Sequence, residues 1–222
     1  MKYRKYKFLV AIAILCFQTV SAQDINWKAL QPNQKHIVNL NAGFDNAATI
    51  GVGYGYHFDM KFPLVADIEY SMPFGNNLFD DFKTKIGGQL DLVHINNFHT
   101  VVKVHGIIRR FENDFARVMN FGSEFAATAG WYRQKWFAAA ELGFDKAITT
   151  HIKHSDLMKE YNPGIQSGWY IPTGGNLFYG LQGGYSSKKT DAYVKLGRTL
   201  SQDFKTETMI PYYFQVGWNF KW

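Results

Sequence analysis

The chain has 222 residues, of which 46% are hydrophobic and 17% aromatic, and it carries a formal net charge of +6. Its first 22 residues contain four basic and no acidic residues, so 20 basic residues face 18 acidic ones in the remainder. This near balance removes the main support for nucleic-acid binding. The only cysteine, Cys16, also lies in the first 22 residues, so the remainder has no disulfide and no thiol chemistry.

Residues 1–22 have the three parts of a secretory signal peptide. Their basic region contains Lys2, Arg4, Lys5 and Lys7. An apolar stretch over residues 8–17 follows, and Val20-Ser21-Ala22 supplies small residues for cleavage. An apolar stretch this short does not cross a bilayer as a helix. We therefore expect cleavage near Ala22 and a short periplasmic N-terminal segment over residues 23–35.

Strand patterns follow one another from residue 36 to the end, without a linker. In each of them apolar and polar residues alternate, which places the two kinds on opposite faces of a strand. The candidate strands cover residues 36–44, 48–58, 62–71, 82–93, 98–110, 117–131, 135–144, 164–171, 176–186, 191–199 and 210–222. No apolar run after residue 22 is long enough for a membrane-spanning helix. The pattern predicts one all-β domain over residues 36–222.

The last of these strands carries the most specific pattern. One face is entirely apolar or aromatic and consists of Ile210, Tyr212, Phe214, Val216, Trp218, Phe220 and Trp222. This ending resembles the terminal strand of Gram-negative outer-membrane β-barrels, whose final aromatic residue is read by the assembly machinery. The resemblance implies an antiparallel up-and-down transmembrane barrel in the outer membrane, porin-like and in contact with lipid and lipopolysaccharide. It also implies that Phe220 and Trp222 form the assembly signal.

The number of strands is left open by the pattern. Bacterial single-chain barrels have an even number of strands, and the candidates above number eleven. A twelfth strand over residues 147–154, rich in β-branched residues, gives the count that we favour, and it makes residues 155–163 a periplasmic connection. The alternative merges or drops one weak segment, gives ten strands, and places residues 145–163 outside as one long loop.

Charged residues and histidines fall on the polar faces of several strands and would point into the lumen of a barrel. This predicted lumen set contains Asp67, Glu69, Lys83, Lys85, Asp91, His99, Lys103, His105, Arg109, Glu124 and Glu141, and in the same way Lys153 and Lys195. Both signs are present. The set fits a network of ion pairs that holds a narrow lumen shut, and it also fits a pore lining or a binding site for a small polar solute.

One short segment contains the residue types of acyl-transfer chemistry, namely His154, Ser155 and Asp156. Outer-membrane lipid A deacylases and phospholipases resemble this chain in being small barrels with a Ser–His pair. In the deacylases one residue separates His from Ser, whereas His154 and Ser155 are adjacent. Neighbouring strand residues point to opposite faces, so these three are weak candidates for catalysis. The same spacing argument leaves no metal site in this segment.

The sequence thus predicts an outer-membrane barrel that forms a small pore or binds a solute in a mixed-charge lumen. The alternative is an outer-membrane hydrolase acting on lipid or lipopolysaccharide, and the third hypothesis is a structural or assembly role in the envelope. No pattern predicts a cofactor.

Overall fold

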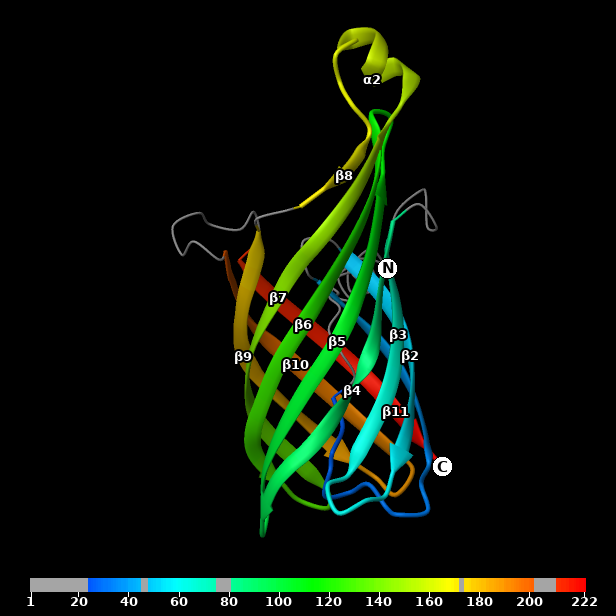
Figure 1. Ribbon diagram of the computed structural model, residues 1–222. Helices are drawn as coiled ribbons and strands as arrows, with labels where there is room; N and C mark the ends of the chain where they lie inside the picture. Colours follow the sequence, from blue (N-terminus) through cyan, green and yellow to red (C-terminus); the bar gives the residue numbers. More distant parts are fainter. Residues whose placement is uncertain (1–23, 45–47, 75–80, 172–173, 202–210) are drawn as a thin grey trace, which may run out of the picture.

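The computed structural model describes residues 24–44, 48–74, 81–171, 174–201 and 211–222 (Figure 1). The expected signal peptide lies outside these residues. The structure is all-β, apart from one short helix, and its strands in chain order are β1 (His36–Phe44), β2 (Ala48–Phe58), β3 (Leu64–Pro73), β4 (Phe82–Ile95), β5 (Phe98–Glu112), β6 (Ala116–Tyr132), β7 (Trp136–His154), β8 (Gly168–Tyr170), β9 (Gly175–Ser186), β10 (Thr190–Ser201) and β11 (Tyr212–Lys221). The helix α2 (Asp156–Tyr161) lies between β7 and β8.

Ten of these strands close into one antiparallel barrel. Around the wall the order is β6-β5-β4-β3-β2-β1-β11-β10-β9-β7, and β7 pairs with β6 to close it. The all-β barrel prediction is confirmed, with ten strands rather than the favoured twelve. Residues 147–154 continue β7, and from the segment 164–171 only the short β8 forms, paired with the far end of β7.

The barrel is apolar outside and polar inside, as the alternating pattern predicts. Leu40, Ile86, Phe125 and Trp218 are among the large exposed apolar side chains, while Glu69, Lys85 and Glu141 are buried. The outer faces of the strands therefore form the apolar band that a bilayer requires, and the polar faces line the interior. No helix in the described ranges is long and apolar enough to cross a membrane.

The wall is taller on one side, because β5, β6 and β7 have 15, 17 and 19 residues whereas the strands from β9 to β11 have 10 to 12. The far ends of these three strands project beyond the rim and carry β8 and α2 (Figure 1). This end is opposite to the C-terminus and to the short turns between β2 and β3, β4 and β5, and β6 and β7. Our prediction of a periplasmic connection over residues 155–163 depended on a twelfth strand, and in the ten-strand barrel this segment lies at the end opposite to the C-terminus.

The N-terminal segment turns into the barrel instead of leaving it. Asp24, Ile25 and Asn26 are each no more than 1% exposed. Ile25 and Trp27 join a buried apolar cluster with Val101, Tyr132 and Phe137 from the wall. Residues 24–27, part of the segment 23–35 that we predicted to be periplasmic, lie inside the barrel at the end where the C-terminus lies (Figure 1). The free energy gained by burying these side chains offsets the entropy lost when this segment becomes ordered.

Candidate functional site: the lumen

The barrel places the predicted lumen set on its inner face, with the exception of Lys153. Ten of its members are buried, and these are Asp67, Glu69, Lys85, Asp91, His99, Lys103, His105, Glu124, Glu141 and Lys195. Lys83 and Arg109 lie nearer the far rim and are half-buried. Buried charges need partners, because an unpaired charge in this environment costs several kcal/mol or more. The pairing of these groups therefore defines the interior.

The charged groups of the wall pair along the wall. Lys85 Nζ donates to Glu124 at 2.6 Å, and His105 Nε2 lies 2.9 Å from the Asp67 carboxylate. Lys195 pairs with Glu141. Each of these pairs joins strands separated by a single strand in the wall: β4 with β6, β5 with β3, and β10 with β7. Together with Arg109–Asp145 and Lys221–Asp191, these pairs line the wall without crossing the lumen.

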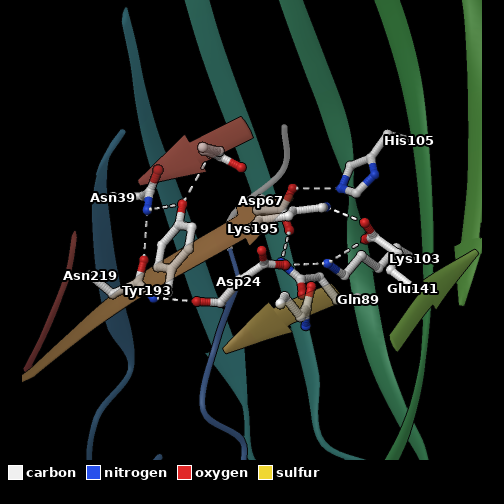
Figure 2. Close-up of polar contacts among 12 residues, drawn as sticks. Asp24, Asn39, Asp67, Gln89, Lys103, His105, Glu141, Tyr193, Lys195 and Asn219 are labelled. Atoms are coloured by element: carbon white, nitrogen blue, oxygen red, sulfur yellow. Dashed lines mark hydrogen bonds and ion pairs between the residues drawn. The ribbon is translucent and has the colours of Figure 1, made fainter. Parts of the chain in front are cut away.

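Asp24 connects opposite sides of the barrel (Figure 2). Its carboxylate accepts a hydrogen bond from Lys103 Nζ of β5 at 2.6 Å, and its backbone carbonyl accepts one from Asn219 Nδ2 of β11 at 2.6 Å. β5 and β11 are five positions apart in the closed ring of ten strands, which is half of the circumference. Lys103 also donates to Glu141 at 3.2 Å, so Asp24 belongs to the charged network of the wall.

Further contacts hold the rest of the N-terminal segment. Asn26 Nδ2 donates to the carbonyl oxygen of Arg133 at 2.8 Å and to Ser186 Oγ at 2.7 Å. Gln34 Nε2 donates to the carbonyl oxygen of Lys188 at 2.7 Å. These are side-chain hydrogen bonds to turns and strand ends, and residues 24–34 add no strand to the sheet. Residues 24–34, which we call the N-terminal plug, are thus connected to the wall by side-chain hydrogen bonds and apolar contacts rather than by a strand ladder.

Large inner side chains fill much of the remaining space by lying opposite glycines. Tyr193 is paired with Gly217, Tyr213 with Gly197, Phe178 with Gly143, and Phe137 with Gly184. At each of these glycines an added Cβ would meet the ring of the partner. The absence of a side chain on one strand thus makes room for a large one on its neighbour, and the interior is packed with both rings and ion pairs.

Several inner residues are absent from the predicted set. Asp145 lies just beyond the strand predicted over residues 135–144, and Asp24 lies in a segment with no strand pattern. Asn39, Asp191 and Lys221 are also absent from the set. The period-two alternation of β1, β10 and β11 could have identified them, since each of them lies on the polar face of its strand. Lys153 is the opposite case. A β-bulge between the pairs Phe121–Thr149 and Gly122–Ala147 reverses the faces of β7, so Lys153 points outward rather than into the lumen.

The residues considered for acyl transfer do not assemble into a catalytic site. Ser155 Oγ accepts the backbone N–H of Met158 at 3.2 Å and caps α2. The His154 ring lies 3.5 Å from Ser167 Oγ rather than against Ser155. Asp156 is bound to Lys159 at 3.0 Å, and this hydrogen bond holds the pKa of its carboxyl below the usual range. Within the described part of the chain no group of three His, Cys, Asp or Glu could hold a metal ion.

Comparison with known proteins gives a likeness in fold only. No protein-family model and no curated protein matches the chain. Among solved structures, it is similar to KdgM porin at 10% identity, covering 84% of this chain and 99% of the porin, with a TM-score of 0.44. KdgM porin in complex with disordered oligogalacturonate gives the same identity and coverage and a TM-score of 0.42. Scores this low carry no argument about function.

The architecture itself defines the class. A closed antiparallel barrel of ten strands, apolar outside and polar inside, is a porin-like small barrel of the outer-membrane type.

Proposed function

We propose that the protein is a small outer-membrane barrel that admits small polar solutes through its mixed-charge lumen and is closed at rest by the N-terminal plug. The observation that carries the proposal is the bridge made by Asp24 between β5 and β11, because these strands lie on opposite sides of the barrel. When this bridge breaks, the ion pairs of the wall named above remain, since each of them joins strands that are neighbours or next but one.

The chemistry of the lumen supports a polar solute without a strong preference for one sign of charge. Lysine, arginine and histidine alternate with aspartate and glutamate around the wall, and no ring of a single sign is formed by the described residues. Rings of one charge are what give channels anion or cation selectivity. A lumen of paired charges instead offers hydrogen-bond donors and acceptors to neutral or zwitterionic solutes.

Localisation belongs to the same proposal. The apolar band supports insertion into the outer membrane after removal of the signal peptide near Ala22. Phe220 is exposed on the outer face and Trp222 stacks on His36 at 5.9 Å between ring centroids, beside the first strand. We expect the assembly machinery to recognise these two aromatic residues, which lie where β11 joins β1 in the closed barrel.

Solute flux into proteoliposomes tests the proposal. The double variant Asp24→Ala and Asn26→Ala removes side-chain contacts of the N-terminal plug, and we expect vesicles that contain it to swell in small neutral sugars several times faster than wild-type vesicles. Lys28→Ala is the matched control, because Lys28 is in the same segment and reaches only the exposed carbonyl oxygen of Asn96, at 3.1 Å. Folded double-variant barrels that leave vesicles as tight as the wild type would favour the structural role in the envelope.

A further inference from the structure

On the outward positions of the described strands, charged residues gather at one end of the barrel. Along the outward positions of the described strands, Arg110, Arg117, Lys146, Lys153 and Arg198 are the basic residues and Glu112 is the acidic one. All six lie toward the end that carries α2, on β5, β6, β7 and β10. These strands and β9 are consecutive in the wall, so the basic residues, which we call the basic band, cover one continuous half of the circumference.

The β-bulge of β7 is what brings Lys153 into the basic band. Below the bulge the even-numbered residues of β7 point outward, as Leu142 and Phe144 do, and above it the odd-numbered residues do. In the strand register, Lys153 therefore lies opposite Arg117 on the outer face, and Arg117 in turn lies opposite Glu112 of β5. Without the extra residue, Ile148, the lysine would face inward. Bulges often re-aim a side chain in this way.

Aromatic residues lie next to the basic band. The ring of Trp169 in β8 contacts those of Phe121 and His151 in tilted arrangements, with ring centroids 6.0 and 5.0 Å apart. Arg198 lies over the ring of Tyr212 at 5.6 Å. Tryptophan and tyrosine gather where hydrocarbon meets headgroups, and basic side chains just beyond them reach the headgroups themselves.

The acidic residue does not neutralise the basic band. Glu112 accepts hydrogen bonds from Arg117 Nε and Nη2 at 2.8 and 2.9 Å, and Arg110 also binds it. One carboxylate thus orients two guanidinium groups and leaves an excess of positive charge. Asp81, just before β4, is bound to the backbone N–H of Glu112 at 2.9 Å. Guanidinium groups bind phosphate through charge and hydrogen bonds, and the Glu112 carboxylate fixes the positions of these two.

We propose that the basic band binds the phosphate groups of lipid headgroups in the leaflet at the α2 end of the barrel. The proposal rests on the barrel spanning a membrane and is independent of solute passage. A phosphate-bearing lipid is favoured over a soluble partner because the basic residues continue the lipid-facing surface, with Arg117 and Lys153 directly beyond its aromatic residues Phe121 and Trp169. Near an anionic membrane surface each basic residue contributes about 1 kcal/mol, or about a fivefold change in affinity.

Lipid retention by the purified full-length barrel tests this site. Two probes are compared by native mass spectrometry, namely bisphosphorylated lipid A and the same lipid with its phosphates removed. We expect the wild type to prefer the phosphorylated lipid and the triple variant R110Q/R117Q/K153Q to bind it at least about tenfold more weakly. The matched control removes three lysines at the opposite end, K61Q/K188Q/K189Q, and we expect it to keep the preference, because these residues are exposed beside the short turns.

Three results would overturn the site: equal retention of the two lipids by the wild type, an unchanged preference in the folded triple variant, or equal losses in the two triple variants. Displacement of the lipid by millimolar inorganic phosphate would show that free phosphate, not a lipid, is the ligand. If the triple variant does not fold, the single variant K153Q and the salt dependence of wild-type binding are measured instead. Lipid binding that changes neither with this substitution nor with salt concentration contradicts the proposal.

Discussion

At the scale of single residues, the interior depends on large side chains placed opposite glycines. Tyr193 lies over Gly217, and its hydroxyl accepts a hydrogen bond from Asn39 Nδ2 at 3.0 Å. The ring is fixed at both ends, by its own backbone and by this bond. The position therefore tolerates no added volume on β11, whereas a glycine whose added Cβ would make only ordinary contacts should accept a methyl group.

Gly217→Ala tests this packing. An alanine Cβ would overlap the Tyr193 ring, so we expect the variant to be destabilised by about 1–3 kcal/mol, the usual cost of overpacking. Gly53→Ala is the control, because the nearest atom to its Cβ is at 3.4 Å, an ordinary contact. Urea unfolding of the refolded proteins in lipid vesicles measures the two differences. Equal loss in both variants would mean that the ring does not fill the space over Gly217.

At the scale of the strand, the environment of the outer face changes along the length of a long strand, and β6 is the example. The outer face of β6 carries Phe125 in the apolar band and Met119 beyond it, where Met119 pairs with Arg110 and His151. We expect Phe125→Arg to destabilise the barrel by about 2–4 kcal/mol and Met119→Arg by about 0–1 kcal/mol.

Unfolding in vesicles of defined thickness gives both numbers. Because the two positions share one strand and one face, their difference reports depth in the membrane rather than strand propensity. Similar costs at both positions would mean that the outer face of β6 does not pass from lipid into water between them.

The strands also show how far the sequence predicts this fold. The alternation of apolar and polar residues predicted the exact bounds of β1 and β2. It also predicted the inward-facing charges of β3 to β7 as far as Glu141, because alternation with a period of two can be read from the local sequence. It could not reveal the bulge at Ile148, which depends on pairing with β6, so residues 147–154 read as a separate strand. The N-terminal plug has no period-two alternation, and its place is defined by tertiary contacts, among them those with Lys103, Asn219 and Ser186.

At the scale of the whole molecule, the ten-strand count decides which ends of the barrel share a side of the membrane. The C-terminus and the short turns lie at one end, and α2 lies at the other (Figure 1). If the termini face the periplasm, as in other bacterial barrels, α2 is outside the cell. This orientation also places the basic band at the outer leaflet.

A cysteine at Lys159 tests the orientation, because Lys159 is exposed in α2 and the chain has no other cysteine after residue 22. We expect an impermeant thiol reagent to label Lys159→Cys on intact cells. A cysteine at Lys61, beside the short turn between β2 and β3, should be labelled only after the outer membrane is breached. The reverse pattern would contradict the ten-strand topology with periplasmic termini.

The central claim is that the N-terminal plug closes a polar lumen, and single-channel conductance tests it most directly. Wild-type barrels and barrels refolded without residues 24–34 are recorded in planar bilayers under the same salt and voltage. We predict that the wild type is closed for most of the record and that the shortened barrel shows steady open currents. A correctly folded shortened barrel that stays silent, or one that conducts no more than the wild type, would contradict the claim.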